Sequence, residues 1–144
     1  MSGTKQNRRD FLKTTAVAGT ALAANLSLLS NVHAEGGDTI KVGLIGCGGR
    51  GNGAADNVLH AAKNVQIVAI GDVFKFRTDD TRKRLLELAE NDAIKDLGNK
   101  VDLPEERCFV GLDAYERVIG SGANYIILAT PPGFRPLHLQ AAVT

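Results

Sequence analysis

The sequence predicts an α/β fold in which helices cover both faces of a parallel sheet. Short apolar runs, such as Ile40–Ile45 and Val65–Ile70, alternate with longer stretches whose apolar residues recur at helical spacing. A glycine-rich segment, Gly46–Gly51, follows the first apolar run directly. Alternating strands and helices of this length form parallel sheets with right-handed crossovers, and a glycine-rich turn after the first strand is typical of doubly wound sheets.

The expected strands are short and mainly apolar, as strands buried on both faces are. Residues 40–45 read IKVGLI, and residues 125–129 read YIILA. Four strands are expected, at Ile40–Ile45, Val65–Ile70, Cys108–Val110 and Tyr125–Ala129. A Rossmann-type sheet would place them in the spatial order 3-2-1-4. The predicted fold class is therefore a Rossmann-type doubly wound parallel sheet, incomplete at four strands.

The expected helices lie between these strands. The first, about Gly49–Ala62, is rich in alanine, and the second, about Thr78–Asn91, has leucines on one side and charged residues on the other. A short helix is expected to end at Gly120, and a further helix is expected to begin near Phe134. The polar stretch Asp92–Glu106 contains glycine and proline and predicts a surface loop.

Residues 1–34 are predicted to be a twin-arginine signal peptide. The segment Asn7–Lys13 contains adjacent arginines, Arg8 and Arg9, and Val32–Ala34 offers the small residues at which a signal peptidase cuts. The weakly apolar stretch between them is shorter than the roughly 20 residues that span a bilayer. An uncleaved amphipathic anchor and a disordered tail are the alternatives. Twin-arginine export carries folded proteins, so we expect a periplasmic or secreted location, with the Tat export machinery as a partner.

The charge of residues 35–144 is slightly negative. The first 34 residues hold four of the 17 Lys and Arg and one of the 16 Asp and Glu, which leaves 13 basic and 15 acidic residues. This balance does not indicate a nucleic acid or a membrane surface as a partner. The two cysteines, Cys47 and Cys108, show neither disulfide nor metal spacing. We interpret them as small buried residues at opposite ends of the sheet.

The segment GCGGRG at residues 46–51 has the spacing of a dinucleotide-binding fingerprint. Gly46 would allow the tight turn from strand to helix, Gly48 would let the backbone approach a pyrophosphate, and Gly51 would let the helix pack close to the strand. The N–H groups and the positive dipole end of that helix would receive the phosphate charge. Asp72 follows the second strand, 21 residues after Gly51, where an acid binds ribose hydroxyls.

The fingerprint therefore predicts that residues 35–144 form a dinucleotide-binding domain. Two other interpretations stay open. One is a glycine-rich turn in an unrelated α/β protein. The other is a methyltransferase, which also has a glycine-rich turn and an acid after the second strand, but usually with the spacing GxGxG. Gly51, at the third fingerprint position, counts against it.

Three segments together resemble the amino-terminal domain of the Gfo/Idh/MocA oxidoreductase family. They are Lys41–Gly51, Ala69–Val73 and Ala129–Pro132, the last followed by His138. The resemblance covers residues 38–144 and is greatest to the secreted, twin-arginine members of the family. It implies a cofactor, NAD or NADP, and a sugar or polyol as the substrate.

The resemblance also implies roles for individual residues. Backbone N–H groups at five positions would hold the pyrophosphate, and these are Gly46, Gly48, Gly49, Arg50 and Gly51. Asp72 would accept hydrogen bonds from the adenosine ribose. Three residues after the last strand, Thr130, Pro131 and Pro132, would pack against the ribose and nicotinamide end. Many members have Asn where Pro132 stands, so one side-chain hydrogen bond is lost here.

The family's catalytic lysine lies in a Glu-Lys-Pro motif beyond a fifth strand, and Thr144 comes before both. We therefore expect a domain truncated before its fifth strand and its substrate domain. No catalytic residue and no metal ligand is assigned. The residues present do not decide whether this chain is itself an enzyme, and a non-catalytic fragment or nucleotide-binding remnant is the alternative.

The cofactor preference depends on the residues around Asp72. Its carboxylate would repel a 2′-phosphate and slightly favours NAD, whereas Lys75 and Arg77 could accommodate NADP. His138 is either a residue of the site or a histidine on a helix face. The expected partners are a nicotinamide dinucleotide and, only together with a second domain, a carbohydrate or polyol. The apolar strand Tyr125–Ala129 would lie at the sheet edge and favours self-association.

Overall fold

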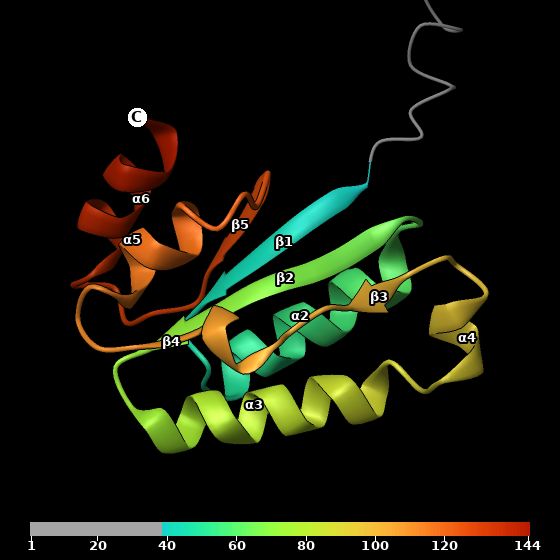
Figure 1. The fold of residues 1–144 in the computed structure, drawn as a ribbon. Coiled ribbons are helices and arrows are strands. Elements are labelled where there is room, and N and C mark those ends of the chain that lie inside the picture. Colours follow the sequence, from blue (N-terminus) through green and yellow to red (C-terminus); the bar gives the residue numbers. More distant parts are fainter. Residues whose placement is uncertain (1–38) are drawn as a thin grey trace, which may run out of the picture. The chain divides into compact units, whose positions relative to one another are not determined.

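A parallel sheet carries helices on both of its faces in the computed structural model, which describes residues 39–144 (Figure 1). Helices α2 and α3 lie on one side of the sheet, and α5 and α6 lie on the other. In chain order the elements are β1 (Ile40–Ile45), α2 (Gly49–Ala61), β2 (Val65–Asp72), α3 (Lys75–Leu88), α4 (Asp92–Lys95), β3 (Lys100–Val101), the 3-10 turn η1 (Glu105–Arg107), β4 (Cys108–Val110), α5 (Ala114–Ile119), β5 (Tyr125–Leu128) and α6 (Arg135–Val143).

The strand order confirms the predicted Rossmann-type sheet. β1 lies in the middle and pairs in parallel with β2 on one side and with β5 on the other. On its outer side β2 pairs with β4 near its carboxyl end and with the additional strand β3 near its amino end. The third and fourth predicted strands are β4 and β5, so their order 3-2-1-4 is the observed one.

The stretch predicted as a loop, Asp92–Glu106, is wrong in part. It contains α4 and β3, and the sheet has five strands among the described residues rather than four. The side chain of Asn91 caps α4 by accepting a hydrogen bond from the N–H of Ala93 at 2.9 Å. β3 pairs with Gln66 and Ile67, far away in sequence. Elements of two and four residues are too short to show a period, so the pattern could not reveal them.

Two other boundaries differ from the prediction. β2 runs to Asp72 rather than Ile70, because its last residues pair with β4 up to Val110. α3 occupies Lys75–Leu88 rather than Thr78–Asn91. The earlier start brings the first turn of α3 next to the carboxyl end of β2, which matters for the site described below.

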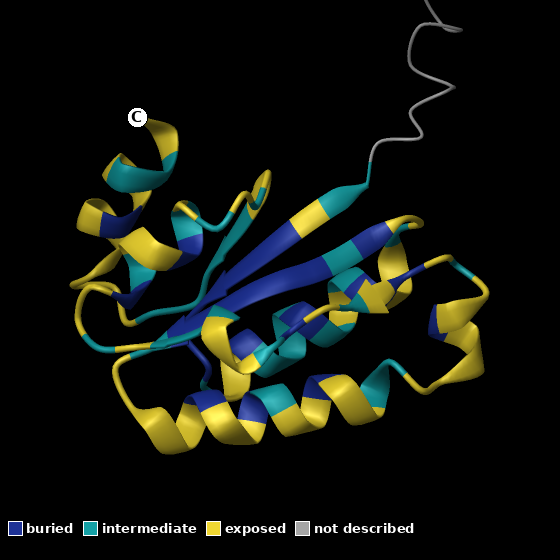
Figure 2. Ribbon diagram, in the orientation of Figure 1, coloured by how far each residue is buried: buried dark blue, intermediate teal, exposed yellow. Residues whose placement is uncertain are grey.

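The core has two parts, one on each face of the sheet (Figure 2). Alternate strand residues point to opposite faces. Leu44 and Ile67 contribute to the larger part, with residues of α2, α3 and α4. Ile45 and Val68 contribute to the smaller part, with Val118 of α5. The buried residues concentrate on β1 and β2, the two central strands.

β5 forms the edge of the sheet next to β1 within the described residues, as predicted for the strand that begins at Tyr125. The Tyr125 side chain is 52% exposed. Self-association through this edge stays a prediction. Among residues 39–144, no helix combines the length and the apolar character that crossing a membrane requires.

α2 crosses the end of β1 at a distance that excludes a side chain. A Cβ atom on Gly51 would collide with the carbonyl oxygen of Gly46. Gly46 has a φ of +101°, and a Cβ there would lie 2.8 Å from the carbonyl carbon of Ala129. The roles predicted for these two glycines, the tight turn and the close approach of helix and strand, match this geometry.

Replacement of Gly51 by alanine tests this crossing. We expect Gly51→Ala to lower the free energy of unfolding by about 1–3 kcal/mol or more, because Gly46 is held by a hydrogen bond to Gly71 and cannot yield. Gly53→Ala in the same helix is the matched control, since its Cβ would meet no described atom within 4 Å. The control should stabilise by about 0.5–1 kcal/mol through helix propensity. Thermal unfolding followed by circular dichroism measures both, and equal shifts would contradict the crossing.

Candidate functional site

A cleft of about 510 Å³ opens at the carboxyl edge of the sheet. Residues that follow β1, end β2, follow β4 and follow β5 all contribute to it, and these are Gly46, Asp72, Gly111 and Thr130 respectively. In doubly wound sheets ligands bind at this edge, where the strand order reverses between the first strand and its neighbour on the far side. Here that neighbour is β5.

Seven of the nine predicted site residues line this cleft. They are Gly46, Gly48, Gly49, Arg50, Asp72, Thr130 and Pro131. Gly51 is buried beneath the fingerprint turn, where it permits the crossing of α2 and β1. Pro132 is exposed and lies outside the lining. The structure thus brings together two loops that are about 80 residues apart in the chain, as the topology of the fold requires.

The amino end of α2 is open toward the cleft. Gly48 precedes the helix with an ordinary extended backbone, and no described side chain caps the first turn. A Cβ on Gly48 would have only the Arg77 guanidinium nearby, at 3.8 Å, and a Cβ on Gly49 would meet no described atom within 4 Å. Both positions therefore have room above the backbone. Unpaired N–H groups and the helix dipole make such an end attractive to an anion.

Asp72 joins two of the loops that surround the cleft. One carboxylate oxygen, Oδ2, accepts a hydrogen bond from the N–H of Cys47 at 2.8 Å. The other, Oδ1, accepts one from the N–H of Phe74 at 3.0 Å. Each oxygen keeps a further lone pair with which it could accept a hydroxyl group. The sequence predicted the position of this acid in the site, but not its role in fixing both loops.

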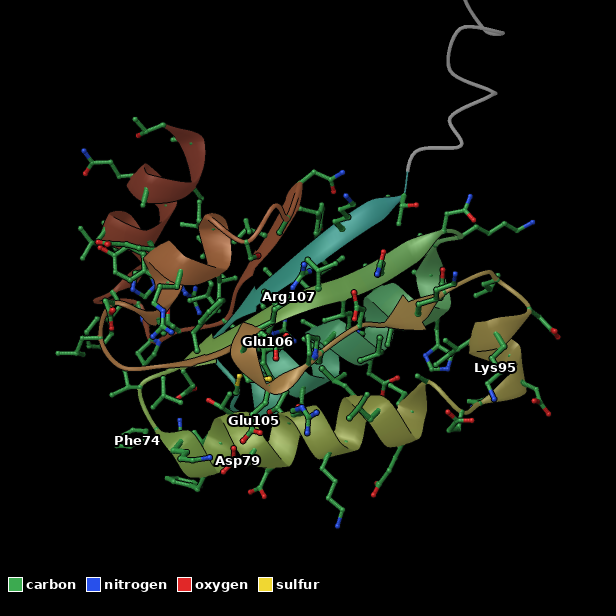
Figure 3. The ribbon with its side chains drawn as sticks, viewed as in Figure 1. Phe74, Asp79, Lys95, Glu105, Glu106 and Arg107 are labelled. Carbon is green, nitrogen blue, oxygen red and sulfur yellow. The ribbon has the colours of Figure 1, made fainter. Side chains whose placement is uncertain are left out.

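Arg77 and Lys75 occupy different positions, although they are two residues apart. Arg77 lines the cleft, with its guanidinium carbon 5.3 Å from the centre of the Phe74 ring and 5.9 Å from that of Phe76. Lys75 is instead paired with Asp79 at 2.8 Å on the exposed side of α3. Figure 3 shows Phe74 and Asp79 at the first turns of this helix. Of the two cations, Arg77 is the one available to a ligand in the cleft.

His138 lies in the wall formed by α6, which supports its role as a residue of the site. It is only 6% exposed and lines the cleft. Its Nδ1 atom is 3.1 Å from the hydroxyl oxygen of Thr130, and its ring stacks on that of Tyr115 at 4.4 Å between centroids. Burial lowers the pKa of His138 below its usual value, so the imidazole is neutral at pH 7.

Several residues of the cleft were not predicted from the sequence. Leu112, Tyr115, Phe134 and Arg135 line it, and the Nε of Arg135 donates a hydrogen bond to the carbonyl oxygen of Thr130 at 2.8 Å. Tyr115 had been interpreted as a packing residue. One signal could have indicated them, because each follows the carboxyl end of a strand closely and so belongs to the same sheet edge.

The two cysteines lie near the same end of the sheet, which corrects their prediction at opposite ends. β4 has only three residues, so Cys108 pairs with Ile70 near the carboxyl end of β2. The sulfur of Cys47 lies 3.6 Å from the carbonyl oxygen of Gly71, the next residue. Burial, together with the nearby Asp72 carboxylate, raises the pKa of Cys47 to about 12. Its thiol is therefore neutral and a poor nucleophile. In the described part of the chain, no three metal-ligating side chains cluster.

Comparison with known proteins gives one family match. Residues 5–24 match the model of the twin-arginine translocation (TAT) pathway signal sequence, which confirms the predicted signal. The cleavage site after Ala34 lies outside the described residues and stays a prediction, as does the division of the chain at that point. No match was found among curated proteins.

Two solved structures similar to this chain are scyllo-inositol dehydrogenases from Lactobacillus casei. One, with bound NAD(H) and scyllo-inositol, has 18% sequence identity and a TM-score of 0.47. The other, in the apo form, has 19% identity and a TM-score of 0.49. In both cases the match covers 74% of this chain and 25% of the dehydrogenase. This chain thus matches about a quarter of the length of each dehydrogenase.

Proposed function

We propose that residues 39–144 bind a nicotinamide dinucleotide in the cleft and form the cofactor domain of an exported oxidoreductase. The observation that carries this proposal is the open backbone of Gly48 and Gly49 at the amino end of α2, which faces the same cleft as Asp72. A phosphate needs the first feature and a ribose needs the second. The type of substrate, a sugar or polyol, rests on the family resemblance alone.

The pyrophosphate would lie against the first turn of α2. The backbone N–H groups of Gly48, Gly49 and Arg50 would bind it, because side chains there are absent or leave the backbone accessible. The arginines in the lining add positive charge, and these are Arg50, Arg77 and Arg135. An anionic ligand with two phosphates suits this charge.

The two ends of the dinucleotide would lie on either side of this turn. Asp72 would accept the adenosine ribose hydroxyls, with Phe74 and Arg77 beside them. Thr130 and Pro131 would contact the ribose and nicotinamide end. A contact from Pro132 is supported only by the resemblance. The hydride chemistry would be that of the nicotinamide, while the residues described here bind and orient it.

Proton transfer to or from a substrate would require a group that we have not assigned in this chain. Within the described residues, no lysine lines the cleft. The same cleft would also serve a protein that binds a nucleotide without turnover. An absorbance assay for NADH with sugars and polyols distinguishes the two, because only the oxidoreductase would produce a signal.

Replacement of Gly48 tests dinucleotide binding. We expect Gly48→Val to abolish binding of NAD without loss of stability, because the new side chain would fill the cleft while meeting only the flexible end of Arg77. Gly133→Val is the matched control, since Gly133 lies outside the cleft and its Cβ would meet no described atom within 4 Å. Titration calorimetry measures both. Equal affinities for NAD in the wild type and Gly48→Val would rule out the proposed phosphate site.

The preference between NAD and NADP depends on Asp72 and Arg77, and we propose that NAD binds better. Asp72→Ala should weaken binding of NAD more than binding of NADP, and Arg77→Ala should do the opposite, each changing the ratio of the two Kd values by about tenfold. The ratio is the informative quantity, because Asp72 also holds two loops and its loss weakens both ligands. Lys75→Ala is the control and should leave the ratio unchanged, since Lys75 is paired with Asp79.

The proposed location, periplasmic or secreted, depends on the signal matched at residues 5–24. Simultaneous Arg8→Lys and Arg9→Lys should retain the protein in the cytoplasm, because the receptor of a twin-arginine signal reads both guanidinium groups. Lys5→Arg is a charge-conserving control outside the pair and should be exported normally. Cell fractionation with immunodetection measures the distribution. Normal export of the double variant would indicate the general secretory route instead.

A further inference from the structure

Helix α6 buries a histidine and exposes its leucines. His138 is 6% exposed and is the only buried residue of this helix, whereas Leu137 and Leu139 are 55% and 54% exposed. An amphipathic helix that only packs on a sheet buries its leucines and leaves titratable residues in water. The burial of His138 therefore calls for a reason other than hydrophobic packing.

The contacts of His138 all belong to the wall of the cleft. Nδ1 is 3.1 Å from the Thr130 hydroxyl oxygen. The imidazole lies nearly parallel to the ring of Tyr115, at 23°, and to that of Phe134, at 22°. Arg135, on the same helix, holds the carbonyl oxygen of Thr130. Two residues of α6 thus hold Thr130, one at its side chain and one at its backbone.

Thr130 transmits this restraint to the fingerprint turn. The space in which Gly46 would carry a Cβ is closed by the backbone of Ala129 and Thr130, with the Thr130 nitrogen 2.9 Å from that position. A displacement of Thr130 would therefore change both the α6 wall and the contact with the turn. The groups that face His138 are the hydroxyl of Thr130, the rings of Tyr115 and Phe134 and the nearby Arg135, and this cation also favours the neutral imidazole.

We infer that His138 is a positioning residue that fixes Thr130 and, through it, the part of the cleft that receives the nicotinamide half of the dinucleotide. The inference rests on the proposed function. It assigns different supports to the two halves of the ligand: α2 and Asp72 serve the ADP half, and the pair Thr130 and His138 serves the other half. A residue that merely stabilised the domain would affect both halves equally.

The test compares binding of NAD with binding of ADP to the full chain by titration calorimetry. His138→Phe keeps a stacking ring but loses the hydrogen bond, and we expect it to weaken binding of NAD by about two- to tenfold, the worth of one hydrogen bond. Binding of ADP should change by less than about twofold. Thr130→Val should have the same effect, and the double variant should be no weaker than either single variant, since both remove the same interaction.

Conservative replacements sharpen the result. Asn places a polar atom near the position of Nδ1 and should restore NAD affinity in His138→Asn, whereas Gln places one near Nε2 and should not restore it in His138→Gln. Equal losses for ADP and NAD, additive losses in the double variant, or no restoration by Asn would each overturn the inference. If His138→Phe does not fold, Thr130→Val still provides the comparison. A wild-type chain that binds neither ligand would overturn the proposed function as well, so the two failures are distinguishable.

Discussion

The contact between α2 and the end of β1 is the constraint on which the rest of the site depends. Gly51 and Gly46 meet backbone to backbone, and no residue with a Cβ can replace Gly51 without moving the helix. The turn is also tied to both neighbouring strands, because the N–H of Gly46 donates to the carbonyl oxygen of Gly71 and the N–H of Ala129 donates to that of Ile45. With the helix held in this way, its first turn can only point into the cleft.

Asp72 extends this rigid unit to the second strand. Its carboxylate receives one N–H group from the loop after β1 and one from the loop after β2, so the two loops cannot move independently. The same hydrogen bonds disperse part of its negative charge. The charged groups of the lining are then one dispersed carboxylate and three arginines, which are Arg50, Arg77 and Arg135. This balance explains how a cleft with an acid at its centre can still accept an anion, provided that the anion also carries hydroxyl groups.

The sequence could predict the features that leave a periodic or spaced pattern. The strands β1 and β4, the alternation of strands and helices, the sheet order and the glycine fingerprint all do so. It could not predict β3, whose two residues exist only through pairing with β2. Nor could it separate Arg77 from Lys75, because successive helical residues differ by 100° and the answer depends on where α3 begins. Hydropathy failed for α6, where a buried His138 replaces the buried leucines that its pattern indicates.

These failures concern the side of the cleft that side chains build. On the side of α2, backbone contacts at Gly46 and Gly51 decide the geometry, and glycine spacing reveals such contacts directly. On the side of α6, the geometry comes from a hydrogen bond to Thr130, a ring stack on Tyr115 and an arginine bound to a carbonyl. Such contacts join residues from different elements and leave no spacing in the sequence. Local patterns fail most where a residue is placed for a ligand rather than for the core, and in this fold that place is the wall around His138.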